Sequence, residues 1–173
     1  MLQQPLVILA SSRKESDTES FLNKVFEYIY YDKIDLLDYN IAPFNYSNTY
    51  PRNDQFDKVV DRILEHQVIV FATPVYWYSM SGLLKGLFDR FTDLITAKKQ
   101  IGRQLEGKSI FLIAVGADKE MPEGFEVPFS LTADYLNQLY QGSIYYSTKS
   151  AKSTNDFDNR LTFFRDKIKK YYS

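Results

Sequence analysis

Residues 68–91 read VIVFATPVYWYSMSGLLKGLFDRF and decide the fold class of this chain. The stretch begins with a continuous apolar run, Val68–Thr73, which is typical of a strand buried on both faces of a parallel sheet. A loop from Thr73 to Gly82 follows it. Beyond the loop, apolar residues recur at helical spacing on one face: Leu83, Leu84, Leu87, Phe88 and Phe91. A buried strand, a loop and an amphipathic helix in this order indicate an α/β protein.

The same alternation recurs along the whole chain. The other apolar runs are Pro5–Ala10, Lys33–Leu37, Ser109–Gly116 and Ser143–Ser147. Helical patterns lie between and after these runs, over residues 21–29, 56–63, 128–140 and 157–168. Five strands alternating with helices predict a flavodoxin-like three-layer sandwich, with a five-stranded parallel sheet of order 2-1-3-4-5 and helices on both faces.

Composition narrows the possible chemistry. A length of 173 residues is that of one domain, 1–173. The chain has no cysteine and one histidine, His66, which excludes thiol nucleophiles, cysteine-bound metals and multi-histidine metal sites. The formal net charge of −1 predicts no attraction to nucleic acid or to anionic membranes. Because no signal-like or membrane-length apolar segment is present, we expect a cytoplasmic protein without membrane insertion.

The loops after the buried strands are where an open parallel sheet binds ligands. The loop after the first run, residues 11–18, reads SSRKESDT and is crowded with hydroxyl groups beside Arg13 and Lys14. Since it opens a helix, its backbone N–H groups and hydroxyls can bind an anion such as a phosphate. The alternative is that Ser16, Asp17 or Thr18 only caps the helix.

Two further loops are candidates. The loop Thr73–Gly82 carries the only tryptophan, Trp77, between two tyrosines, and such a loop suits a flat, partly apolar ligand. An aromatic cluster that covers the sheet end, or a dimer contact, is the alternative. In the loop after the fourth run, Gly116 would allow a ligand close to the backbone, or it is an ordinary strand exit.

Two other features are interpreted as structural. Residues 102–109 match the P-loop pattern by letter, but they precede a strand instead of following one, so we expect no nucleotide there. His66 ends a helical pattern and is expected to be a polar cap and not a catalyst.

Three segments together carry a family resemblance: SSRKESDTESFL, FATPVYWYSMSGLLKGLFDRF and GKSIFLIAVGAD. They resemble the phosphate loop, the flavin-ring segment and the third flavin loop of the NADPH-dependent FMN reductase family. The sequence departs from the family pattern at Ala10, where glycine is frequent, and at Asp17, where asparagine is common.

The resemblance implies an FMN cofactor, a reductant that is NADPH or NADH, and a homodimer. It also implies roles for individual residues. The phosphate would be held by Ser11, Arg13, Ser16 and Thr18, with Asp17 offering only its backbone N–H. The isoalloxazine ring would be bordered by Pro74, Val75, Tyr76 and Trp77, with Gly116 against its pyrimidine side.

The function implied is an NAD(P)H-dependent oxidoreductase in which FMN passes hydride to a small acceptor: a quinone, an azo or nitro compound, or free flavin. FMN itself carries this chemistry, so no catalytic side chain is expected. Two alternatives stay open. One is a flavodoxin-type electron carrier, which the near-neutral charge disfavours. The other is a flavin-free interaction protein on the same fold.

Overall fold

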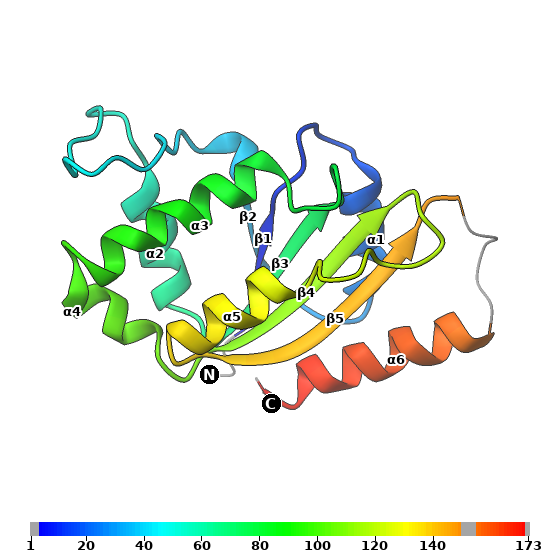
Figure 1. The fold of residues 1–173 in the computed structure, drawn as a ribbon. Coiled ribbons are helices and arrows are strands. Elements are labelled where there is room, and N and C mark those ends of the chain that lie inside the picture. Colours follow the sequence, from blue (N-terminus) through cyan, green and yellow to red (C-terminus); the bar gives the residue numbers. More distant parts are fainter. Residues whose placement is uncertain (1–3, 150–154, 172–173) are drawn as a thin grey trace.

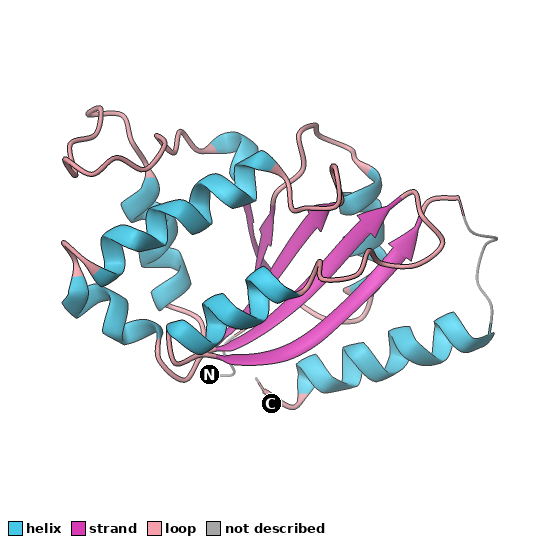
Figure 2. Cartoon of the chain, viewed as in Figure 1, coloured by secondary structure: helices cyan, strands magenta, loops and turns pink. Residues whose placement is uncertain are grey.

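A computed structural model describes residues 4–149 and 155–171, and it contains a parallel five-stranded sheet (Figures 1 and 2). The strand order is β2-β1-β3-β4-β5, so the predicted order is confirmed. The strands are β1 (Leu6–Leu9), β2 (Asp32–Asp35), β3 (Val68–Pro74), β4 (Ser109–Gly116) and β5 (Leu139–Ser147).

Helices cover both faces of the sheet (Figure 1). One face packs against α2 (Phe56–Leu64), α3 (Gly82–Ile95) and α5 (Val127–Tyr135), and the other against α1 (Asp17–Val25) and α6 (Asn155–Lys169). Shorter helical segments are η1 (Leu36–Asp38), α4 (Lys99–Gly102) and η2 (Arg103–Leu105). The structure is therefore the predicted three-layer sandwich.

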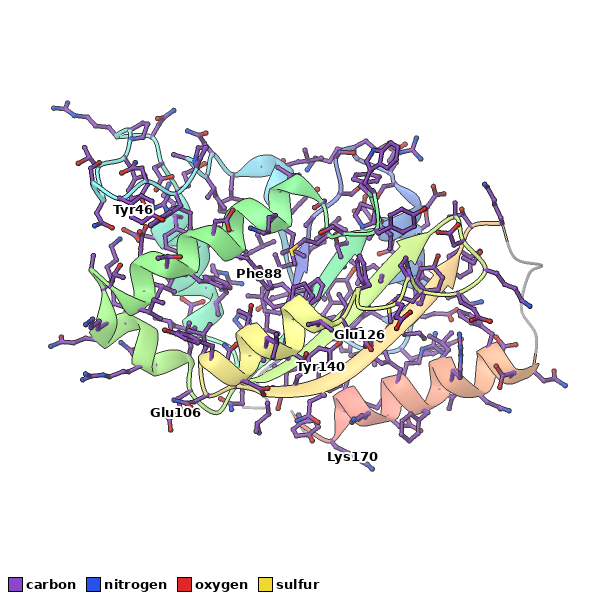
Figure 3. The ribbon with its side chains drawn as sticks, in the orientation of Figure 1. Tyr46, Phe88, Glu106, Glu126, Tyr140 and Lys170 are labelled. Carbon is purple, nitrogen blue, oxygen red and sulfur yellow. The ribbon has the colours of Figure 1, made fainter. Side chains whose placement is uncertain are left out.

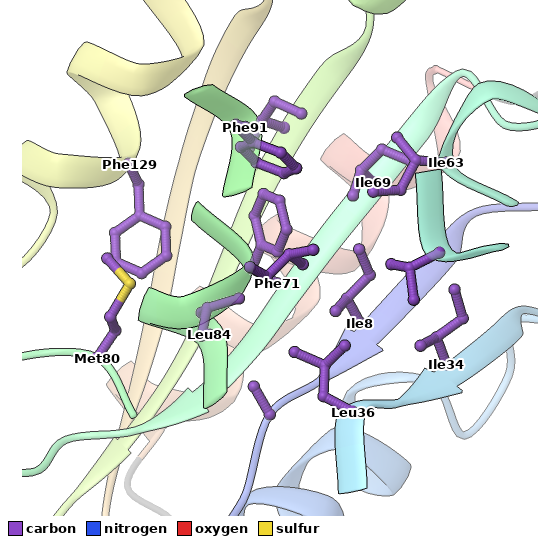
Figure 4. Close-up of a cluster of buried hydrophobic side chains, with 14 of the residues drawn as sticks. Ile8, Ile34, Leu36, Ile63, Ile69, Phe71, Met80, Leu84, Phe91 and Phe129 are labelled. Carbon is purple, nitrogen blue, oxygen red and sulfur yellow. The ribbon is translucent and has the colours of Figure 1, made fainter. Parts of the chain in front are cut away.

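The central strands contribute side chains to two separate cores, because their side chains alternate between the two faces of the sheet. In β3, Ile69 and Phe71 point into the core under α2, α3 and α5, whereas Val68, Val70 and Ala72 point into the core under α1 and α6. Figure 4 shows the first of these cores, in which Phe71, Phe91 and Phe129 gather. Burial on both faces explains why these strands read as continuous apolar runs.

The predicted helix over 128–140 is wrong at its end. Helix α5 stops at Tyr135, and β5 already begins at Leu139, four residues before the predicted strand. Asn137 adopts a left-handed conformation (φ 53°) that ends the helix. A hydrogen bond from the Leu139 N–H to the Lys108 carbonyl then extends the ladder to the start of β4. An apolar pattern alone does not distinguish a helix from a strand over so short a stretch.

The long loop 40–53 is fastened to α3 by one buried cation. The Arg90 side chain is 1 % exposed and pairs bidentately with Asp54, at 2.9 and 3.0 Å, and with Asp93 at 2.8 Å. Its guanidinium lies over the ring of Tyr50, whose hydroxyl donates to Asp93. This network holds the loop against the helix that follows β3.

Candidate functional site

The three candidate loops meet at the carboxyl edge of the sheet. Backbone hydrogen bonds continue the ladder to the strand ends, from the Ala10 N–H to the Ala72 carbonyl (2.8 Å) and from the Val75 N–H to the Val115 carbonyl (2.7 Å). The loops after β1, β3 and β4 therefore leave the sheet side by side. This edge is the position at which doubly wound sheets bind ligands.

The first loop ends in a well-formed helix N-terminus. Ser16 is the N-cap of α1, and its hydroxyl oxygen accepts the N–H of Glu19 at 3.2 Å. The N–H groups of Asp17 and Thr18 donate to no acceptor within the described part of the chain, as expected of the first turn of a helix. Ser16 thus performs the capping role, and two N–H groups stay available for an anion.

The charged side chains of this loop pair within the protein. Arg13 and Asp17 form an ion pair of 3.3 Å in which both side chains are about two-thirds exposed. Lys14 turns toward the end of β2, where it pairs with Asp35 and Asp38 at 2.7 Å each. Asp17 therefore directs its carboxylate outward, while its backbone N–H belongs to the free first turn. Ser11 and Thr18 are buried at the base of the loop.

The second loop is a strained two-residue turn. Tyr76 and Ser79 exchange both backbone hydrogen bonds, at 2.9 and 3.0 Å. Trp77 and Tyr78 between them have φ values of 48° and 63°, which makes a type I′ turn. Such turns favour asparagine and glycine, and bulky residues are rarely found with positive φ. The turn leaves Trp77 94 % exposed. Backbone strain of this kind is concentrated at ligand sites.

Side-chain hydrogen bonds hold this loop at both ends. At its start, the hydroxyls of Ser12 and Tyr76 are joined at 2.8 Å, which links the loops after β1 and β3. At its end, buried Thr73 accepts the N–H of Ser81, the N-cap of α3. From the sequence, Ser12 is only one of several hydroxyls that could add donors in its loop, and nothing near it indicates its long-range partner.

The third loop shows a different reason for its glycine. A Cβ built on Gly116 would lie 2.6 Å from the Tyr145 hydroxyl, and that hydroxyl donates to the Asp118 carbonyl at 2.9 Å. Gly116 therefore makes room for the Tyr145 ring, and its position beside β3 keeps it next to the second loop.

His66 and Lys108 lie at the opposite, amino edge of the sheet. His66 is buried between the Arg62 carbonyl and the Asp32 carboxylate, at 2.7 and 2.8 Å. The Lys108 ammonium donates to the Leu64 and His66 carbonyls. Desolvation by burial lowers the pKa of Lys108. Both residues bind carbonyl groups at the end of α2, so His66 acts as a polar cap there, and Gly107 and Lys108 form a turn before β4.

The donor set at the carboxyl edge fits a phosphate joined to a planar ring. Free N–H groups, hydroxyls and the exposed Arg13 guanidinium suit a phosphate, and a rigid turn of exposed backbone and aromatic rings suits a flat heterocycle. FMN has both parts.

Over residues 4–149 and 155–171 there is no group of three or more potential metal ligands. No helix in these ranges is long and apolar enough to cross a membrane.

Comparison with known proteins also indicates an FMN-dependent protein. The family model described as NADPH-dependent FMN reductase matches residues 5–127. A curated relative of Bacillus subtilis (strain 168), "Putative NAD(P)H-dependent FMN-containing oxidoreductase YwqN", is 30 % identical over 147 residues, covering 80 % of this chain and 81 % of the relative.

Two solved structures share the fold. The Trp repressor binding protein from Bacillus subtilis has a TM-score of 0.69 at 22 % identity, covering 98 % of this chain and 99 % of its own. An FMN-dependent NADH-azoreductase from Bacillus anthracis str. Ames Ancestor, solved in complex with FMN, has a TM-score of 0.66 at 12 % identity, with 98 % and 99 % coverage.

Proposed function

Because this chain belongs to the NADPH-dependent FMN reductase family, we propose that it is an NAD(P)H oxidoreductase whose FMN delivers hydride to a small acceptor: a quinone, an azo or nitro compound, or free flavin. The observation that carries the proposal is the meeting of an anion-binding helix N-terminus and a strained aromatic turn at one sheet edge. When bound, FMN supplies the hydride-accepting and hydride-donating ring.

The phosphate end is assigned to the first loop. The N–H groups of Asp17 and Thr18 and the hydroxyls of Ser11 and Ser16 supply donors, and Arg13 supplies a charged fork once it leaves Asp17. The Ser16 hydroxyl can keep its cap, because its oxygen accepts from Glu19 while its own hydrogen stays free to donate.

The ring end is assigned to the second and third loops. Pro74, Val75, Tyr76 and Trp77 border it mainly through backbone. The hydrogen bond from Val75 to Val115 and the type I′ turn that begins at Tyr76 fix their peptide groups. Gly116 follows Val115, which is paired to Pro74 in the sheet, so it lies where the ring's polar edge would meet the backbone. No acid–base side chain is needed for hydride transfer, which is consistent with a chain that has a single histidine at the other edge.

The assembly proposed is a homodimer of the whole 173-residue domain in the cytoplasm. Helix α5 carries three exposed apolar side chains, Val127, Leu131 and Tyr135. Beside them, a hollow of about 370 Å³ lies between α3 and α5. A contiguous apolar surface of this kind supports a subunit contact.

The rival functions differ in what they predict. An electron carrier would bind FMN and stabilise its one-electron form, and such carriers dock through a strongly charged face, which a net charge of −1 does not favour. A flavin-free interaction protein would bind no FMN at all.

The test is an absorption titration of the purified protein with FMN, followed by NADPH and then NADH without oxygen. A bound-flavin spectrum that a nicotinamide bleaches in a two-electron step supports the reductase. A bound flavin that neither nicotinamide bleaches, with a stable one-electron state on chemical reduction, supports the carrier. Absence of binding overturns the proposal. Reoxidation by a quinone, an azo dye, a nitro compound and free FMN, each alone, then ranks the acceptors.

A further inference from the structure

A large hollow lies along β5 and reaches residues 119–121, which come directly after the third loop. Its volume is about 1200 Å³, above the 300–1,000 Å³ usual for small-molecule sites. Residues 119–121, which follow β4, form one wall, β5 forms the floor from residue 141 to 147, and α6 forms the other wall. Figure 1 shows β5 as the last strand of the sheet with α6 beside it. We call this hollow the β5 groove.

The floor of the β5 groove is the edge of the sheet. Strand β5 pairs with β4 on one side, and no strand among the described residues pairs with it on the other. An open strand edge presents N–H and C=O groups at the spacing of an extended peptide. The Thr148 N–H donates to the Gly116 carbonyl of β4. Because successive residues of a strand direct their backbone groups to opposite sides, the groups of Ser143 and Tyr145 face the open side within residues 143–146.

The two walls receive side chains from opposite faces of an added strand. Tyr145 and Met121 both pack against the core on the α5 side of the sheet, and Tyr146 packs with Phe157 on the α6 side. Phe163 of α6 lines the groove and is 69 % exposed, which is unusual for a phenylalanine without a partner. Successive side chains of an added strand would point alternately to these two sides, so each side would receive every second residue.

The charge of the β5 groove favours an acidic occupant. Four cationic side chains line it, against two acidic ones. The cations are Lys119, Lys149, Arg160 and Lys167, and the acids are Glu120 and Asp156. Arg160 and Asp156 pair weakly at 3.9 Å, and Lys167 donates to the Gln141 carbonyl. Lys119 and Lys149 have no hydrogen-bond or ion-pair partner within the described residues.

We propose that the β5 groove binds an extended acidic segment of a partner protein as a sixth strand, with apolar side chains at alternate positions. Main-chain hydrogen bonds to the outward-facing groups of Ser143 and Tyr145 hold the segment, and its acidic residues face Lys119 and Lys149. A second copy of this chain would bring the same cations together across the edge, so like-charge repulsion disfavours it.

Lysine at a strand edge also serves to prevent strand pairing, and Lys167 does so at Gln141. Protection alone does not account for the exposed Phe163 or for a hollow of this size. The two explanations differ in whether the edge accepts an acidic strand.

The test uses the full chain with FMN added. A soluble heptapeptide that alternates glutamate with valine, its lysine–valine counterpart, and a glutamate–valine version with a central proline are titrated by fluorescence anisotropy. We expect the glutamate peptide to bind at least tenfold more tightly than the other two, and to slow amide hydrogen exchange at residues 143–146. K119E/K149E should reverse the preference between the two charged peptides, and Phe163→Ser should weaken binding. The matched control is Lys170→Glu, an exposed residue directly after α6 and outside the groove (Figure 3), which should change neither result.

Equal binding of all three peptides, absence of binding, or protection that maps elsewhere would overturn the proposal. Protection of residues 143–146 that grows with protein concentration without peptide would assign the edge to a second copy instead. None of these outcomes depends on FMN reduction, so failure here is distinct from failure of the proposed function.

Discussion

The Ser12 and Tyr76 hydroxyls form a 2.8 Å hydrogen bond between loops that are 64 residues apart in sequence. The bond links the loop after β1 to the strained turn after β3. Both partners are accessible to solvent, so its loss leaves no buried unpaired group. Its contribution is that of an ordinary hydrogen bond, about 0.5–1.5 kcal/mol.

We expect this bond to preorganise the site for FMN. Ser12→Ala and Tyr76→Phe should each weaken FMN binding by about two- to tenfold. The double variant should be no weaker than the more affected single variant, because each change removes the same bond. The measurement is a double-mutant cycle on Kd from quenching of FMN fluorescence. Tyr78→Phe is the matched control, since Tyr78 belongs to the same turn but has no hydroxyl partner within the described residues. Additive effects would show that the two hydroxyls act independently.

The Arg13–Asp17 pair sets a competition between carboxylate and phosphate. Asp17→Asn should tighten FMN binding by a few-fold, because it removes a like charge near the phosphate and releases Arg13. The same change should lower the unfolding free energy by about 0.3–1 kcal/mol, since Asp17 is an acid in the first turn of α1. Titrations with FMN and with riboflavin, which lacks the phosphate, check the first effect, and urea denaturation checks the second. Equal gains for both ligands would rule out the electrostatic explanation.

The strain in the aromatic turn also has a measurable cost. Tyr78→Gly should raise the free energy of unfolding by about 1 kcal/mol, because glycine adopts the positive φ at that position without a steric penalty. Tyr78→Val should lower it, since a β-branched residue fits that conformation poorly. Thermal denaturation of the FMN-free protein should show that the two variants shift Tm by a few degrees in opposite directions. A loss of Tm in both variants would mean that the Tyr78 ring contributes more than its backbone strain costs.

The sequence is sufficient for the sheet and for the loops that meet at its carboxyl edge, because each rests on local patterns. The continuous apolar runs gave β1, β3 and β4, and the loops that follow them do converge. Long-range side-chain pairing was not predictable. Nothing near Ser12 indicates Tyr76, and nothing near Gly116 indicates the Tyr145 ring that fills the space beside it. The end of α5 was misplaced because a single left-handed residue, Asn137, decides where that helix stops.

The burial of Arg90 was not predictable from the sequence either, because a charged residue within a helical pattern is usually solvent-exposed. Because Arg90 is buried between two carboxylates, replacing it tests most directly what holds the 40–53 loop. Arg90→Met should lower the unfolding free energy by about 3–5 kcal/mol, since Asp54 and Asp93 would be left buried without their cation. Arg62→Met, at an ion pair whose arginine is 39 % exposed, is the control and should cost less than about 1 kcal/mol.

The pH dependence identifies the carboxylate involved. Partial burial raises the pKa of Asp54, but hydrogen bonds from Arg90 and the Ala42 N–H outweigh this effect and hold the pKa below its ordinary value. A lowered folded-state pKa stabilises the protein above the ordinary value near 4, and the stabilisation is lost as the pH falls through the folded-state pKa. The difference in unfolding free energy between wild type and Asp54→Asn should therefore be largest near neutral pH and shrink below about pH 4. Urea denaturation from pH 7 to pH 2.5 measures it, and a difference that stays constant over this range would show that the carboxylate charge contributes nothing to the Arg90 network.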